Sequence, residues 1–261
     1  IRRLESEKSN LTLQLNQVIN KLNNASANYE KWAEYLLSYS TGYLNYTVKR
    51  VFSEEELEGL RDLLMTEVLT NPKYRWESYQ DIYEWITSNI KYARDEPFPC
   101  PPSFEDFIYG NVEYEMICDS MMAPSEVLEL RQGDCDDQAA LAYAMIQSYR
   151  RYICGKEYIL WLMRTDFTDG SAHLAVAFPA IGSNNQTLLT IIDPAGHYLT
   201  KDVFGRIDAK DPFVELDNYK DYWANSGDII ETITLYEIGD GVAYVIVSGN
   251  VYEVASYIAS H

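Results

Sequence analysis

The sequence predicts an α+β fold in which helices come first and strands follow. Helix start signals and periodic apolar residues dominate up to about residue 152, whereas short runs of branched and apolar residues separated by turn residues begin at residue 158. The N-terminal residues show a third pattern, that of a long helix with a narrow apolar stripe. The chain has 261 residues, 47% of them hydrophobic, which suits one large domain with an extension. We therefore expect an extension over residues 1–50 and a domain over residues 51–261.

The extension is expected to be a helical coiled-coil stalk. Its apolar residues recur with alternating spacings of four and three, which is the repeat of a coiled coil. So narrow a seam is buried either against another chain, which would give a homo-oligomer, or along the chain's own domain, and the pattern favours neither. The seam consists of Leu11, Leu15, Val18, Leu22, Ala25, Tyr29, Trp32 and Leu36.

The first half of the domain shows two clear helix patterns. Ser53-Glu54-Glu55-Glu56 is a capping box, so a helix is predicted to start at Ser53 and to stop near Asn71-Pro72. A further helix is predicted from about residue 77 to residue 92, and the proline-rich run 97–102 ends it. Residues 103–123 are predicted as an irregular loop, and a loop of this length in a compact domain is usually functional or mobile.

The second half changes from helices to strands. A short helix over residues 125–130 and the tight turn Gly133-Asp134-Cys135 lead into an apolar helix that reaches about residue 152. Beyond it, turn residues separate short apolar runs, which predicts an antiparallel meander and then a hairpin. The predicted strands are 158–164, 172–178, 188–192, 229–238 and 242–247, and a last helix covers about 251–260.

Net charge argues against a nucleic-acid partner. The chain has 40 acidic and 21 basic residues, a formal charge of −19, and such a surface repels phosphate backbones and anionic lipids. High solubility explains this excess without any partner, while basic partners, cations and neutral polymers are alternatives. The 22 tyrosines suit partly solvent-exposed contacts with other macromolecules, because each has an apolar ring and a hydrogen-bonding hydroxyl.

The sequence favours an extracellular or cell-surface location, with the cytoplasm as the alternative. It contains no apolar run of the roughly 20 residues that a membrane helix needs, and no signal-peptide pattern. Because it begins at Ile1 rather than Met, we expect that an upstream segment, such as a membrane anchor, was removed. Candidate glycosylation sequons lie at Asn10, Asn24, Asn45 and Asn185.

Four cysteines are too few for a disulfide-stapled scaffold, and they lack the paired spacing of a zinc ribbon. Cys100 and Cys118 lie in one long connection, so a loop-tying disulfide is expected between them in an oxidising compartment, with two free thiols as the alternative. Cys154 lies at the far end of its helix beside Gly155 and is expected to be a packed side chain.

The remaining cysteine, Cys135, opens a helix. Unpaired N–H groups and the positive end of the helix dipole lower the pKa of a thiol at this position. Acyl transfer also needs an imidazole within reach and a third group that holds the ring. Among three histidines, His197 follows a turn and His261 is terminal, whereas His173 begins a strand and is the candidate. Asp193 ends the next strand, so neighbouring strands can bring its carboxylate beside the imidazole.

These residues resemble the transglutaminase-like superfamily, a branch of the papain-like thiol enzymes. The resemblance rests on Gly133-Asp134-Cys135-Asp136-Asp137 at a helix start, His173 on a strand and Asp193-Pro194-Ala195 about twenty residues later. It covers about residues 76–200 and implies a papain-like core, in which the Cys-bearing helix packs on an antiparallel sheet, with the C-terminal hairpin and helix within 201–261. It also implies that Cys135 is the nucleophile, His173 the general base and acid, and Asp193 the residue that orients His173.

One segment departs from the family. Members often carry His-Ala-Trp-Val-Glu on the histidine strand, whereas this chain has His173-Leu174-Ala175-Val176-Ala177, so the family's substrate contacts do not carry over. Each candidate also has an ordinary structural explanation, because a cysteine at a helix start, a strand histidine and an Asp-Pro turn are common in proteins without catalysis. Asp136 and Asp137 similarly suit a helix start. Only the combined order and spacing favours an active site.

The resemblance implies acyl transfer on amide bonds through a thioester, with a protein or peptide as substrate. We favour hydrolysis by a cysteine peptidase because water is always available, whereas a transglutaminase-type cross-linking enzyme, the first alternative, must also bind an amine. A non-catalytic surface adhesion or assembly protein on the same fold is the alternative from another class. No cofactor is expected, and because no EF-hand-like loop is present, no specific metal is predicted.

Overall fold

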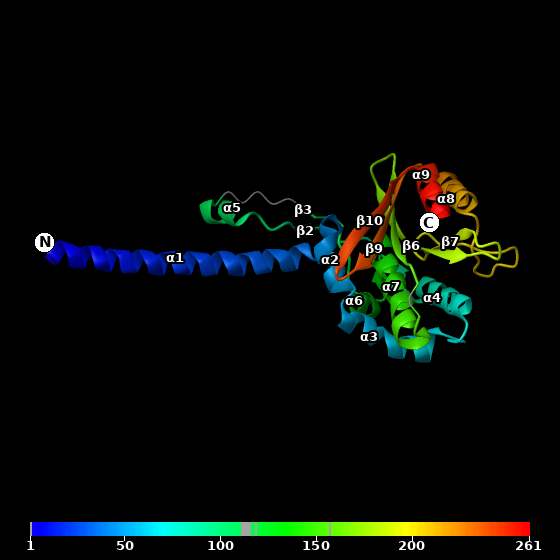
Figure 1. Cartoon of the computed structure of the whole chain (residues 1–261), viewed down its shortest axis with the longest axis horizontal. Coiled ribbons are helices and arrows are strands. Elements are labelled where there is room, and N and C mark those ends of the chain that lie inside the picture. Colours follow the sequence, from blue (N-terminus) through cyan, green and yellow to red (C-terminus); the bar gives the residue numbers. More distant parts are fainter. Residues whose placement is uncertain (1, 111–115, 118, 157) are drawn as a thin grey trace.

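An antiparallel sheet with helices on both faces organises the structure, a computed structural model that describes residues 2–110, 116–117, 119–156 and 158–261 (Figure 1). Within these residues the sheet has six strands in the order β10-β9-β5-β6-β7-β8. Its central strands alternate buried side chains between the two faces, as strands enclosed on both sides must. The strands are β5 (Trp161–Phe167), β6 (Ala172–Ile181), β7 (Thr187–Asp193), β8 (Tyr198–Leu199), β9 (Ile230–Gly239) and β10 (Val242–Gly249).

One face of the sheet is covered by the helix that carries Cys135. The side chains of Leu141, Met145 and Ile146 on this helix are fully buried, and they share a core with Leu162 and Val176 of the sheet. The helices of this layer are α3 (Glu54–Leu63) with its π-helical continuation η2 (Leu64–Val68), α4 (Arg75–Asn89), α6 (Pro124–Leu130), and α7 (Cys135–Ser148) with its π-helical continuation η3 (Tyr149–Cys154). The predicted α+β core, with the cysteine helix packed on an antiparallel sheet, is therefore confirmed.

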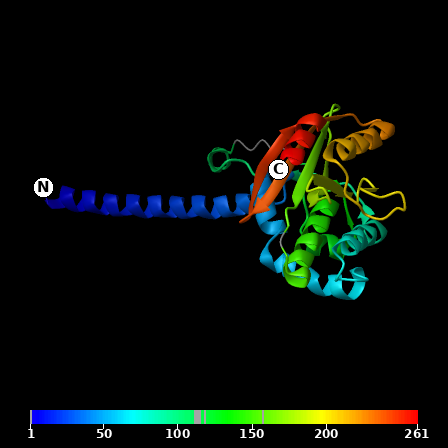
Figure 2. The ribbon, with the colours of Figure 1, turned by 45° about the vertical axis from the view of Figure 1, so that its right-hand side comes forward.

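The opposite face is covered by α8 (Pro212–Ser226) and α9 (Val251–Ser260), so the sheet lies between two helical layers (Figure 2). Helix α9 was predicted from the sequence, whereas α8 was not. Helix α8 nevertheless has a standard start, because the Asp211 side chain accepts hydrogen bonds from the backbone N–H groups of Phe213 and Val214. Pro212 occupies the first helical position, and Gly227 ends the helix with a positive φ of 98°.

The segment predicted as an irregular loop, 103–123, contains regular structure. Ser103 accepts a hydrogen bond from the backbone N–H of Asp106 and caps α5 (Phe104–Tyr109), which Gly110 ends. On either side of α5, β2 (Phe98–Pro99) pairs with β3 (Met116–Ile117) in a short arm that lies beside α1 (Figure 1). A separate parallel pair, β1 (Lys91–Tyr92) with β4 (Gln132–Gly133), lies directly before Cys135.

The N-terminal extension is one long helix, α1 (Arg2–Leu37), which projects away from the sheet (Figure 1). Residues 38–50, which were assigned to this extension, instead pack on the domain. They include η1 (Thr41–Tyr43) and α2 (Leu44–Val51), where Val48 and Val51 are fully buried. Ser40 forms a β-bridge with Ser120. The projecting part therefore ends at Leu37, because the next residues have apolar and backbone partners in the domain.

No helix among the described residues combines the length and the apolar character that crossing a bilayer requires.

Removing residues 1–37 is expected to leave the domain folded with nearly unchanged stability, whereas removing residues 1–51 should strongly destabilise it. The second truncation removes the buried side chains of Val48 and Val51, and burial of one valine contributes roughly 1.5–3 kcal/mol to the free energy of unfolding. Urea unfolding of the 38–261 and 52–261 chains measures the difference. Equal midpoints for the two truncations would contradict this boundary.

Candidate functional site

Cys135 occupies the first turn of α7 because a tight turn leads into the helix. Gly133 is required there, since a Cβ atom at this position would lie 2.5 Å from the Cβ of Asp137. The Asp137 carboxylate accepts a hydrogen bond from the backbone N–H of Asp134 at 3.2 Å, and the Gln138 side chain donates to the carbonyl of Gly133 at 3.0 Å. These contacts hold the turn that presents the partly exposed thiol of Cys135 at the helix end.

His173 and Asp193 form a buried pair. The Nε2 atom of His173 lies 2.9 Å from each carboxylate oxygen of Asp193, and both side chains are buried. The adjacent strands β6 and β7 bring them together, with Val176 paired to Ile192 at the end of the ladder. Because Nε2 faces the carboxylate, it carries the proton in the neutral ring.

Cys135 meets the same strand. The backbone N–H of Leu174, the residue after His173, donates a hydrogen bond to the thiol of Cys135. The structure therefore brings the helix end that carries Cys135 to the start of β6, where His173 lies against Asp193. All three residues predicted from the sequence lie in this one region.

The predicted lowering of the Cys135 pKa is not what its surroundings produce. Burial raises the pKa of the Cys135 thiol far above its ordinary value, and the nearby charges of Asp136 and Asp134 raise it further. The hydrogen bond from Leu174 acts in the opposite direction and is outweighed. Burial, together with the neighbouring carboxylates, therefore sets the direction of the pKa shift at this thiol.

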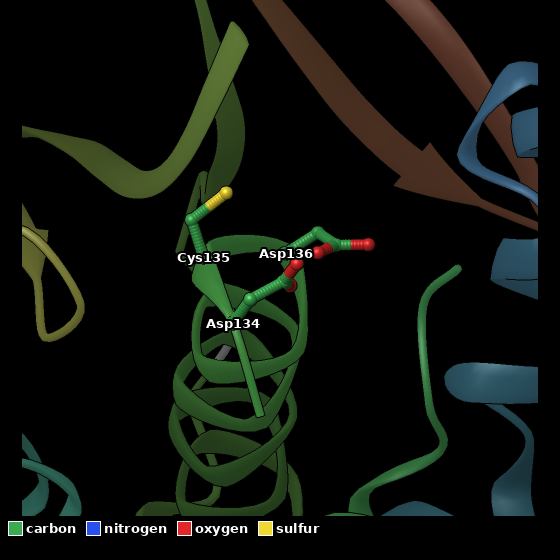
Figure 3. A group of neighbouring side chains, drawn as sticks. All are labelled: Asp134, Cys135 and Asp136. Atoms are coloured by element: carbon green, nitrogen blue, oxygen red, sulfur yellow. The ribbon is translucent and has the colours of Figure 1, made fainter. Parts of the chain in front are cut away.

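An acidic cluster surrounds the first turn of α7, and the sequence analysis missed it. The side chains of Asp134 and Asp136 point toward one another beside Cys135 (Figure 3). Asp95 belongs to two further groups of three carboxylates, one with Asp134 and Asp137 and the other with Asp119 and Asp136. Within each group, one carboxylate oxygen from each residue lies within 4.8 Å of the others. Neither carboxylate oxygen of Asp136 has a hydrogen-bond partner among the described residues.

The pKa values in this cluster reflect crowding of like charges. Burial raises the pKa of Asp137 to about 7 and that of Asp95 to about 6, with the charge of Asp134 adding to both. Burial, with contributions from Asp134 and Asp137, raises the pKa of Asp136 well above its ordinary value. Several carboxylates therefore share a volume in which their full ionisation is unfavourable without a positive charge.

Helix α8 supplies further contacts that the sequence analysis did not predict. The Tyr219 hydroxyl donates to Oδ2 of Asp193 at 2.9 Å, and the Trp223 ring lies 4.6 Å from the His173 ring between centroids. On the loop after β7, the backbone N–H of Gly196 donates to Oδ1 of Asp193 at 2.8 Å. The start signal Asp211-Pro212 could have identified the helix, but no local pattern indicates which of its side chains face Asp193.

A pocket of about 490 Å³ adjoins the site through Leu174, which is one of its lining residues. The sheet contributes Arg164, Tyr236 and Val245 to the lining, and the segment from Thr41 to Tyr46 forms the other wall. Arg164 pairs with Asp166 at 2.8 Å and is the cation among the lining residues. The pocket is thus mainly aromatic and apolar with one positive group.

The other predicted site residues lie elsewhere. Cys118 is outside the described residues, so its disulfide with Cys100 stays a prediction. Cys154 packs against the core beside α7, as expected. Asn10, Asn24, Asn45 and Asn185 are all exposed, and their glycosylation stays a prediction.

Comparisons with known proteins place this geometry in context. Residues 62–193, which are 132 of the 261 residues, match a family model described as a transglutaminase-like domain. No curated protein matches the chain. A solved structure of Legionella pneumophila LapG is similar at 14% identity and a TM-score of 0.35, with 87% of this chain and 91% of that chain covered.

Two further structures of Legionella pneumophila LapG are also similar. The calcium-bound form has 14% identity, a TM-score of 0.33 and coverage of 74% of this chain and 90% of that chain. The EGTA-treated form has 17% identity, a TM-score of 0.32 and coverage of 70% and 78% respectively.

Proposed function

Because this chain belongs to the transglutaminase-like domain family, we propose that it is a cysteine-dependent hydrolase of amide bonds in peptides or isopeptides. The observation that carries the proposal is the buried pair of His173 and Asp193, with the Cys135 thiol accepting a hydrogen bond from the backbone N–H of Leu174, the residue after His173. An imidazole fixed by a carboxylate beside a thiol is the arrangement that activates a cysteine nucleophile.

The proposed reaction uses the three residues in sequence. Nδ1 of His173, whose Nε2–H is directed at Asp193, takes the Cys135 proton while the sulfur attacks the amide carbonyl carbon. The imidazolium returns this proton to the leaving amine as the C–N bond breaks, which leaves a thioester. Water, deprotonated by the same ring, then attacks the thioester and releases a carboxylic acid and the free thiol.

Whether water or an amine attacks the thioester distinguishes a hydrolase from a cross-linking enzyme. If an amine attacks the thioester instead of water, the same residues catalyse transglutaminase-type cross-linking. Hydrolysis is favoured because it needs no second binding site. The adjoining pocket, with its apolar walls and Arg164, supports a peptide or protein as the substrate. A surface or extracellular substrate accords with the proposed location outside the cell.

Replacement of His173 by Ala is expected to slow alkylation of Cys135 by iodoacetamide by on the order of tenfold or more between pH 6 and pH 8. The imidazole that accepts the thiol proton is then missing, and the thiol keeps its raised pKa. Peptide mass spectrometry measures the rate at Cys135 separately from the other cysteines.

His197→Ala is the matched control, because His197 is an exposed histidine on the loop after β7. Its alkylation rate should equal that of the unaltered protein. If His173→Ala also alkylates at the unaltered rate, the enzymatic proposal is wrong and the adhesion or assembly role becomes the better account.

We further propose that the acidic cluster binds a divalent cation, in contrast to the sequence analysis, which predicted no metal. Asp95, Asp119, Asp134, Asp136 and Asp137 provide the oxygen ligands that Ca²⁺ prefers. The unpartnered oxygens of buried Asp136 fit such an ion. A bound cation would offset the negative charge that raises the pKa of the Cys135 thiol.

Without divalent cations, the cluster is expected to make the protein less stable as pH rises from about 4 to about 7. Asp137 and Asp95 have folded-state pKa values of about 7 and about 6, above the ordinary 3.8, so the folded state binds more protons in this window. Their contribution to stability is therefore complete below pH 4 and is lost as pH rises. Thermal unfolding in EDTA across this range measures the loss.

Calcium should raise the melting temperature at pH 7.5, since a ligand that binds only the folded state stabilises it. Asp136→Asn should reduce calcium binding in isothermal titration calorimetry and raise stability in EDTA. Asp217→Asn, which alters an exposed carboxylate on α8, should change neither. Unchanged calcium affinity in Asp136→Asn would refute the cation site while leaving the proposal for Cys135 intact.

Helix α1 supports a third proposal, that two copies of the chain form a coiled coil. Its seam is exposed in the part that projects beyond α5, from Leu11 at 65% exposed to Leu22 at 51%. Continued toward the N-terminus with the same spacing, the seam reaches Lys8, with Glu7 next to it, so in a parallel pair each Lys8 lies near the partner's Glu7, a complementary arrangement. Nearer the domain, Tyr29 packs on Phe104 and Phe107 of α5.

Sedimentation equilibrium should therefore show a dimer that Leu15→Asp combined with Leu22→Asp converts to a monomer, because two charges then enter the apolar seam. Asn16→Asp combined with Asn23→Asp adds the same charge on the other faces of α1 and should remain a dimer. A monomeric unaltered chain at micromolar concentration would contradict this proposal.

A further inference from the structure

Helix α8 lies beyond residues 62–193, the range that matches the family, yet one of its faces covers the His173–Asp193 pair. Tyr219 is fully buried in this face, and its ring contributes to the core on that side of the sheet. Its hydroxyl is the part that is directed at the site, because it donates to Oδ2 of Asp193 at 2.9 Å. The contact joins a helix outside the matched range to the proposed catalytic residues.

Asp193 accepts hydrogen bonds on both of its oxygens. The backbone N–H of Gly196 donates to Oδ1, and the Tyr219 hydroxyl donates to Oδ2. His173 Nε2 lies 2.9 Å from each oxygen, so the ring nitrogen is equidistant from the two oxygens that these donors hold. Loss of either donor would leave the carboxylate free to rotate about its last bond and to tilt away from the ring.

The space around this carboxylate is tightly enclosed. A Cβ atom at Gly196 would lie 2.3 Å from Oδ2 of Asp193 and 2.9 Å from the ring of Trp223. The Trp223 ring in turn packs against His173. Water is therefore kept from the hydrogen bond between imidazole and carboxylate, which strengthens each contact within it.

We propose that Tyr219 is a positioning residue, whose hydroxyl holds the Asp193 carboxylate in the orientation that fixes His173 toward Cys135, with Trp223 covering the pair. This inference rests on the proposed function of Cys135 and His173. A phenylalanine would fill the same core space, so the hydroxyl itself, rather than the ring, carries the role. Burial and the charge of Asp193 raise the pKa of Tyr219 well above its ordinary value, so this hydroxyl stays a donor throughout the working range.

Several titratable groups surround this pair. Asp193 faces His173 from β7, Cys135 approaches from α7, and Tyr219 approaches from α8. Tyr83 on α4 and Tyr222 on α8 are also close enough for the charge of Asp193 to raise their pKa values. Removal of the Tyr219 hydroxyl takes a donor from the carboxylate and lets it tilt, so the hydrogen bond between Nε2–H of His173 and Asp193 should weaken.

The test compares Tyr219→Phe with the unaltered full-length chain in two measurements. Alkylation of Cys135 by iodoacetamide should slow by about tenfold, the loss expected for one hydrogen bond to a charged group. The NMR signal of the Nε2–H proton of His173 should move upfield, because its hydrogen bond to Asp193 weakens. A purely structural role for Tyr219 would lower the melting temperature without moving this signal.

Tyr198→Phe is the matched control, since the Tyr198 hydroxyl also donates to a buried carboxylate, that of Glu215 at 2.7 Å. It should lower stability to a similar extent without changing the alkylation rate or the NMR signal of the Nε2–H proton of His173. If alkylation depends on His173 but Tyr219→Phe matches the unaltered chain in both measurements, the positioning role is refuted and the proposed function stands. If alkylation does not depend on His173, the proposed function itself has failed.

Discussion

The proposed active site depends on the pairing of β6 with β7. This antiparallel ladder ends with Val176 opposite Ile192, so Asp193, the last residue of β7, lies just beyond the ladder, while β6 continues back past His173. The alternation of side chains places Leu174 and Val176 in the core on the α7 side, whereas Ala175 and Ala177 lie in the core on the α8 side. A shift of one residue in this register would exchange the two faces and separate imidazole, carboxylate and thiol.

Much of the fold and the three central residues could be predicted because their signals are local. Ser53 begins a capped helix, Gly133-Asp134-Cys135 forms a helix entry, and the hairpin after residue 229 has a glycine-containing turn. Two neighbouring strands with a histidine on one and an aspartate ending the other indicated a pair, which the structure contains at 2.9 Å. Each of these inferences needed only short stretches of sequence.

The remaining parts of the site come from contacts between segments far apart in the chain. Asp95 and Asp119 reach the start of α7 through the folding of a connection whose helix and paired strands were not predicted. Tyr219 reaches Asp193 from a helix that was missed, although its capping residues were visible. The direction of the Cys135 pKa shift differs from the prediction for the same reason, because the burial of the thiol and the carboxylates around it arise only in three dimensions.

The attachment of α1 has a mechanical consequence. The chain leaves the helix at Leu37 and binds the domain immediately through the bridge of Ser40 with Ser120 and through a hydrogen bond from the N–H of Met121 to the carbonyl of Tyr39 at 2.8 Å. The next residue, Met122, donates to Asp137 of the acidic cluster at 2.6 Å. Tension along α1 is thus borne first by the strand segment that helps to hold the acidic cluster. A pull on this helix would load the environment of Cys135 together with the hydrophobic core, to which Met121 itself belongs.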